Sequence, residues 1–232
     1  MFELFKGEFY ALFAALLWVF GALVFEVLGK KNGATVVNFL RLVIALIFLM
    51  IFTSITRGKI LPFDFDKESW LWLFLSGIVG FAIGDYFLFK AFVSIGARIS
   101  MLIMSLAPPV AAVLGWLILD EKLSQNQYWG MIVTLAGISL VVLQKKRAGT
   151  NVKLKNLKYP IIGILLAIGG AVGQGAGLVL SKLGMKDQDA FAATEIRIIA
   201  GIIGLAIILS FTKNWKRVAM TSKIKKDMGL IS

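Results

Sequence analysis

The sequence predicts an all-α membrane protein, built as a multi-helix transmembrane bundle with duplicated architecture. Hydrophobic residues make up 59% of the 232 positions, more than a soluble domain of this length buries. Charged residues are only 16% of the chain, and they gather between long apolar runs, as they do in the loops of membrane proteins. A polar pattern also recurs at a constant offset of 156 residues: Arg41, Ser54, Thr56 and Arg57 return as Arg197, Ser210, Thr212 and Lys213.

Seven apolar segments have about the length of roughly 20 residues that a helix needs to span a bilayer. In chain order they are residues 9–28, 36–55, 70–92, 99–119, 128–143, 159–180 and 191–211. Each is predicted as a helix, because backbone groups in lipid must be hydrogen-bonded within the segment. Most connections are short, which favours antiparallel neighbours, and the two longest, 144–158 and 212–227, are polar and basic.

The four prolines fit these boundaries. Pro62 falls in a loop and Pro160 in a first helical turn, where a missing N–H costs nothing. Pro108 and Pro109 fall inside the fourth segment and predict a kink there, because they leave backbone carbonyls without donors. The kink has two interpretations, a plain bend or a break that faces the substrate.

The offset divides the chain into two copies of one unit. The first copy is predicted at residues 7–145 with five helices, followed by a basic connecting loop at 146–158. The second copy, 159–232, holds two helices and the start of a third, so we expect it to be incomplete. Because five is an odd number, consecutive copies insert with opposite orientation, which predicts an inverted repeat with a site between its halves.

The net charge of +12 suggests either nucleic acid or anionic lipid as a partner. Most Lys and Arg residues lie just outside apolar runs, which favours anionic lipid headgroups at basic loops and argues against nucleic acid. Lys and Arg are more numerous in one set of loops, and loops rich in these residues lie in the cytoplasm. This distribution predicts an N-terminus outside the cell. The chain has neither histidine nor cysteine, so we expect no metal site and no cofactor.

Several motifs point to one family. They are Gly84-Asp-Tyr-Phe-Leu-Phe-Lys-Ala91, Ser94-Ile-Gly-Ala-Arg-Ile-Ser100, Ser105-Leu-Ala-Pro-Pro109, Leu119-Asp-Glu-Lys-Leu-Ser124, the pair Gly130 and Gly137, and the dipeptides Leu40–Arg41 and Ile196–Arg197. This order resembles the EamA-type transporters of the drug/metabolite transporter superfamily, although Asp120 stands where glycine is commoner. The resemblance implies ten helices, export of amino acids or related small metabolites, and two cytoplasmic termini, in conflict with the charge distribution. The expected location is the plasma membrane of a prokaryote.

Ionisable and polar groups inside the predicted helices are the candidates for substrate binding or coupling. They are Asp85, Tyr86, Arg41, Trp18, Gln174, Glu195 and Arg197. Asp85 is the sharpest, because a carboxyl among apolar helices suits a coupling proton or a cationic substrate group. The alternative is a structural carboxyl that a donor such as Arg41 satisfies.

The other candidates also have two interpretations. Arg41 and Arg197 either line the cavity or extend to headgroups. Glu195 precedes Arg197 by two residues, which places them on different helix faces, and it is a second coupling candidate. Gln174 is either a ligand contact or a link between helices, and Gly173 and Gly177 have the spacing of close helix packing.

The function predicted from these observations is a secondary transporter that moves a small metabolite by alternating access, with proton coupling as an option. The alternatives are an inactive fragment or a non-catalytic membrane partner. A lipid-modifying intramembrane enzyme is less favoured, because only isolated carboxylates are present as reactive groups. The sequence leaves the substrate and a homodimer open.

Overall fold

The computed structural model describes residues 6–143 and 160–223, and throughout these ranges the regular structure is helical. The predicted all-α bundle is confirmed. Its elements are α1 (Lys6–Asn32), α2 (Ala34–Arg57), α3 (Lys67–Gly77), the π-helix η2 (Ile78–Gly84), α4 (Asp85–Ile95), α5 (Ala97–Met104), α6 (Ala107–Leu119), α7 (Gln125–Leu143), α8 (Ile161–Met185), α9 (Ala190–Phe211) and α10 (Trp215–Lys223). The predicted connecting loop at 146–158 lies outside the described residues.

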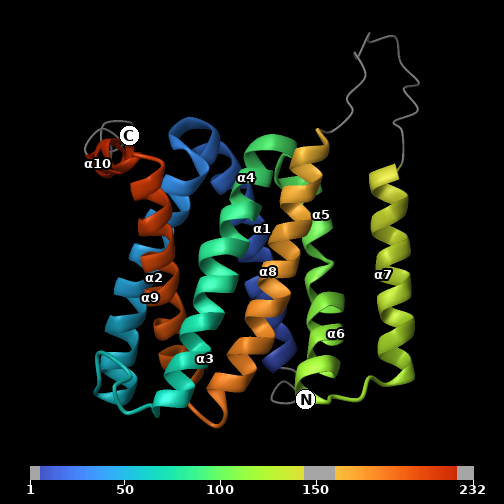
Figure 1. Cartoon of the computed structure of the whole chain (residues 1–232), viewed down its shortest axis with the longest axis horizontal. Coiled ribbons are helices and arrows are strands. Elements are labelled where there is room, and N and C mark those ends of the chain that lie inside the picture. The colour runs from blue at the N-terminus through green and yellow to red at the C-terminus, as the bar shows by residue number, and fades with distance from the viewer. Residues whose placement is uncertain (1–5, 144–159, 224–232) are drawn as a thin grey trace.

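Six of the described helical stretches are long and apolar enough to cross a membrane. They are Phe9–Asn32, Ala34–Arg57, Lys67–Ile95, Ala97–Leu119, Ile161–Met185 and Ala190–Phe211. Helix α7 occupies the place of the fifth predicted segment. In Figure 1, α1 and α8 run in opposite directions through the bundle, and so do α2 and α9. Opposite directions are what an inverted repeat would require, and the division into two copies stays a prediction.

The helix ends show why certain residues stand at the turns. Helix α2 is followed by the capping residue Gly58, whose φ of 67° lies in the left-handed region that glycine adopts without a steric cost. Asp120 ends α6 with a φ of 56°. This is the position where the family resemblance expects glycine, and the left-handed backbone explains that expectation, since aspartate is among the few other residues that tolerate it.

The third predicted segment is not one uninterrupted α-helix, as the sequence led us to expect. Seven residues, Ile78–Gly84, form the π-helix η2 between α3 and α4, and Asp85 follows immediately. A π-helical turn holds an extra residue and is frequent at functional sites. The apolar and glycine-rich composition of this stretch fits an α-helix equally well, so the sequence carried no signal for it.

Helix α8 lies against this segment through glycines on both sides. A Cβ built on Gly173 would lie 2.6 Å from the Cα of Gly84, and one built on Gly177 would lie 2.9 Å from the Cα of Gly80. The two backbones therefore touch, as the spacing of Gly173 and Gly177 predicted. The hydroxyl of Ser76 donates to the carbonyl of Gly177 at 2.6 Å and holds the same contact.

The fourth segment divides at its prolines. Helix α5 ends at Met104 and α6 begins at Ala107, with Pro108 and Pro109 in the first turn of α6. The N–H groups in the first turn of a helix have no carbonyl partner within that helix. A proline at such a position therefore loses no helical hydrogen bond. The break therefore falls at Ser105 and Leu106, just before the prolines.

Candidate functional site

A buried polar cluster joins three helices near the start of α4. Asp85, only 1% exposed, forms an ion pair with Arg41 of α2 through Oδ2 and Nη2. Its other oxygen, Oδ1, accepts a hydrogen bond of 2.5 Å from Nε2 of Gln174 on α8. Both carboxylate oxygens are thus bonded, by side chains far apart in the sequence. We call Asp85, Arg41 and Gln174 the Asp85 cluster.

Arg41 is held in place from several directions. Its Nη2 also donates to Oδ1 of Asn38 at 3.0 Å, and its guanidinium carbon lies 5.2 Å from the ring centre of Phe89 and 5.9 Å from that of Phe25. Aromatic faces attract a cation that has left water. The Nε of Arg41 is buried without a partner, so the guanidinium keeps one unused donor beside the cluster.

Gln174 links the carboxylate to the π-helix. In addition to Asp85, its Nε2 donates at 3.3 Å to the carbonyl oxygen of Gly80, inside η2. One amide group therefore contacts both the charged residue and the backbone of the irregular turn that precedes it. A change in the helical geometry of η2 would alter this bond directly.

Arg197 of α9 lies next to the Asp85 cluster but forms no ion pair. Its guanidinium carbon is 4.7 Å from the ring centre of Phe81, and its Nη2 is 3.8 Å from the point where a Cβ on Gly80 would lie. Its Nε is buried without a hydrogen-bond partner. Among the described residues no carboxylate oxygen comes within 4.0 Å of its nitrogens.

Glu195 occupies a separate place. It is fully buried, and its Oε1 accepts a hydrogen bond of 2.5 Å from the hydroxyl of Thr53, while Oε2 has no partner. Thr53 follows Arg41 on α2 by twelve residues, about 18 Å along a helix at 1.5 Å per residue. The two buried carboxyl groups therefore stand at different depths in the bundle.

Two sequence candidates, Tyr86 and Trp18, form no bond with the Asp85 cluster. The hydroxyl of Tyr86 accepts a hydrogen bond of 2.5 Å from Lys90, whose ammonium lies 4.2 Å from the ring centre. Trp18 on α1 is 44% exposed. Sequence reasoning missed Asn38, a fully buried amide three residues before Arg41, which its position one turn away on the same helix face could have suggested.

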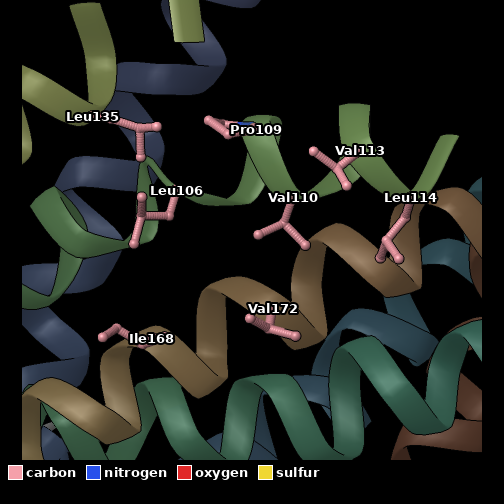
Figure 2. A pocket seen from close by; sticks show the side chains of 8 residues that line it. All are labelled: Leu106, Pro109, Val110, Val113, Leu114, Leu135, Ile168 and Val172. Carbon is pink, nitrogen blue, oxygen red and sulfur yellow. The ribbon is translucent and has the colours of Figure 1, made fainter. Parts of the chain in front are cut away.

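A cavity of about 340 Å³ lies between α6, α7 and α8, and Figure 2 shows the side chains that line it. They are Leu106, Pro109, Val110, Val113, Leu114, Leu135, Ile168 and Val172. On α8, Val172 points into this cavity, and Gln174 follows two residues later, a rotation of about 200° on a helix of 3.6 residues per turn. The cavity and the Asp85 cluster therefore lie on opposite faces of α8. No grouping of acidic residues that suits a metal ion occurs in the described ranges.

The two ends of the bundle differ in charge. The end that carries α10 in Figure 1 has six described basic side chains, Lys30, Lys31, Arg98, Lys213, Lys216 and Arg217, against one acid, Glu26. The other end has six, Arg57, Lys59, Lys67, Lys122, Lys182 and Lys186, against seven acids, Asp64, Asp66, Glu68, Asp120, Glu121, Asp187 and Asp189.

Ion pairs account for much of the charge at the second end. Arg57 donates to Asp64 at 2.8 Å, Lys182 pairs with Glu121, and Lys186 donates to Glu68 at 2.9 Å. The hydrogen bond to Glu68 raises the pKa of Lys186 above its ordinary value. The positive charge at the α10 end has far fewer acidic partners within the described chain.

The chain is similar to known membrane proteins. The EamA-like transporter family matches residues 5–143. Solute carrier family 35 member G1 of Homo sapiens is 23% identical over 211 residues, which cover 90% of this chain and 56% of that protein. Protein LicB of Haemophilus influenzae is 25% identical over 213 residues, 88% of this chain and 67% of that protein.

An uncharacterized membrane protein of Saccharomyces cerevisiae is also 25% identical over 174 residues, 70% of this chain and 42% of that protein. The chain thus spans between 42% and 67% of the length of these curated relatives. No solved structure gives a significant match.

Proposed function

The chain belongs to the EamA-like transporter family, and from this membership we propose that it forms part of a secondary transporter that moves a small metabolite by alternating access. The observation that supports this most is the Asp85 cluster. A carboxylate that is 1% exposed among membrane helices is costly, and such groups mark substrate, ion and proton pathways. Here it also ties α2, α4 and α8 together, so its protonation or its release from Arg41 would loosen three helices at once.

Two irregular segments are suited to the motion. The π-helix η2 ends where Asp85 begins, and the break at Ser105 and Leu106 divides α5 from α6. Discontinuous helices near a midplane site are a recurring feature of transporters that rock one repeat against the other. We propose that both segments act as hinges, with Asp85 as the group that senses substrate or proton. Export of an amino acid or a related solute is the direction that we propose from the family resemblance.

Transport by proteoliposomes tests this function. Purified chain is reconstituted, and counterflow of a mixture of radiolabelled amino acids is measured with and without an imposed pH gradient. Asp85→Asn keeps the shape of the side chain and removes its charge. We therefore expect flux to fall by at least about tenfold, which corresponds to a barrier raised by about 1.4 kcal/mol. Asp64→Asn, which alters an ion pair in a loop, is the matched control and should keep its flux.

Equal flux in Asp85→Asn and the unaltered chain would remove Asp85 from the mechanism. Flux that depends on Asp85 but ignores the pH gradient would leave the carrier in place and exclude proton coupling. A chain that carries no solute in any arm would favour the alternative of a non-catalytic membrane partner or an inactive fragment.

We propose further that the basic α10 end faces the cytoplasm, where anionic lipids attract Lys and Arg side chains. The test uses the lack of native cysteine. Single substitutions Lys31→Cys and Lys122→Cys place thiols at opposite ends of the bundle. A membrane-impermeant maleimide applied to whole cells should label Cys at position 122 and spare position 31, and the reverse pattern would invert the orientation.

A further inference from the structure

Arg197 is a cation inside the bundle that forms no ion pair within 4.0 Å in the described chain, although the charge of Asp85 acts on it from farther away. The other arginine of the same kind, Arg41, has Asp85 as its counter-ion, and Arg57 has Asp64 at the end of α2. Arg197 has the ring of Phe81 against its guanidinium and a buried Nε that bonds to nothing. An isolated charge in a membrane helix is expensive and usually functional.

Neither of the two buried carboxyl groups of the described chain, Asp85 and Glu195, bonds to it. Both oxygens of Asp85 are already bonded, one to Arg41 and the other to Gln174. Glu195 is held by Thr53, and it lies only two residues from Arg197, a spacing that points side chains toward different faces of a helix. The described interior around the cluster thus carries two guanidinium groups and one carboxylate, an excess of one positive charge.

We propose that Arg197 binds the anionic group, a carboxylate or a phosphate, of the solute that passes through this site. A guanidinium presents N–H groups in a planar fork that fits two oxygens of such an anion, and contact with an aromatic face fixes that plane. Phe81 supplies the face, and the buried Nε, which bonds to nothing, leaves the guanidinium with an unused donor. The proposal rests on the proposed transport function and names the class of substrate.

An anion also fits this geometry better than a cation. A cationic solute would have to displace both Arg41 and Gln174 to reach Asp85. An anion that approaches Arg197 displaces neither of these bonds, because Arg197 has no carboxylate oxygen within 4.0 Å in the described chain. Binding would then neutralise the excess positive charge, and release would restore it, which favours exchange of one anion for another over an empty site.

Ligand-dependent stability tests the proposal without measuring flux. The purified chain in lipid nanodiscs is heated while tryptophan fluorescence reports unfolding, at constant ionic strength. Sodium acetate and sodium phosphate are the two anionic probes, and acetamide is the uncharged match for acetate. A ligand that binds only the folded chain raises its unfolding temperature. We expect at least one anion to raise it, with no shift from acetamide; the arm that responds identifies carboxylate or phosphate as the group.

Three variants assign the effect to Arg197. Arg197→Gln should lose the anion-dependent shift. Arg197→Lys keeps the charge without the planar fork and should weaken anion affinity by roughly tenfold. Arg57→Gln, which removes a guanidinium bonded to Asp64, should leave the shift as it is.

An equal shift in Arg197→Gln and the unaltered chain overturns the proposal, and so does the absence of any anion-dependent shift in the unaltered chain. If Arg197→Gln does not fold, Arg197→Lys decides: undiminished affinity for the anion overturns the proposal. Failure here is separate from failure of the transport function. If a neutral or cationic solute is transported but no anion raises the unfolding temperature, only the anion site is contradicted. If an anion raises the unfolding temperature but no solute is transported, only the transport function is contradicted.

Discussion

Arg41 and Arg197 stand at the same place in the two copies that the offset of 156 predicts, yet they have different surroundings. Arg41 is bonded to Asp85 and Asn38 and lies near two aromatic rings. Arg197 has one ring and no bonded anion in the described chain. Two positions that the offset predicts as equivalent therefore need not have equivalent partners, because each partner comes from another helix. Arg41 is therefore suited to an ion pair inside the bundle, and Arg197 is suited to a ligand.

The largest effect that we expect comes from Arg41→Gln. It leaves Asp85 buried without its cation, and removal of one member of a buried pair costs about 3–5 kcal/mol. Arg197→Gln should cost less than about 1 kcal/mol, because no ion pair is broken. Unfolding in detergent and urea measures both. Equal losses would erase the contrast between the two arginines, and adding Asp85→Asn to Arg41→Gln should recover most of the first loss.

The next largest effect concerns the contact between α8 and η2, beside the Asp85 cluster. Gly173→Ala places a Cβ 2.6 Å from the Cα of Gly84, against backbone that cannot rotate away. We expect a loss of about 1–3 kcal/mol in unfolding free energy, the usual range for overpacking. Gly137→Ala on α7 is the control, since nothing lies within 4 Å of its added Cβ. If both variants kept full stability, the result would contradict the close backbone contact between α8 and η2.

A smaller loss is expected from Gln174→Leu. It removes the hydrogen bonds to Asp85 and to the carbonyl of Gly80, at a cost of about 1–3 kcal/mol for the groups left unbonded, with the lower end expected because the ion pair with Arg41 remains. Circular dichroism under urea gives the stability. The same variant should leave the anion-dependent shift assigned to Arg197 in place, which separates the two arginines a second time. Loss of that shift would mean that they work as one unit.

The smallest effect is predicted for Arg57→Gln. Its pair with Asp64 lies at the end of the bundle with both side chains in part exposed to solvent. Such pairs contribute about 0–1 kcal/mol and weaken with salt. Urea unfolding at low and high salt should show a slight loss that disappears as salt rises. If Arg57→Gln lost as much unfolding free energy as Arg41→Gln, depth in the membrane would not determine how much an arginine contributes to stability.

The sequence predicted the helices because each needs only a long apolar run, and it offered the pair of Asp85 and Arg41 as one of two interpretations. From the spacing of Gly173 and Gly177 alone, it predicted that this face of the helix packs closely against another helix. It did not predict the bond between Thr53 and Glu195, which joins residues 142 positions apart and depends on how two helices rotate against each other. Nor did it predict η2, because the pattern of apolar side chains fits both helix types.

The π-helix has a consequence for length variation along this chain. One residue deleted from an ordinary α-helix rotates everything beyond it by about 100°, which would carry Asp85 away from Arg41 and Gln174. A deletion within Ile78–Gly84 can be absorbed instead, because the wide turn relaxes to an α-helical one and the flanking helices keep their relative rotation. In homologous proteins, insertions and deletions of one residue in this helix should therefore occur mainly within the stretch that corresponds to Ile78–Gly84. There they preserve the alignment of Asp85 with Arg41.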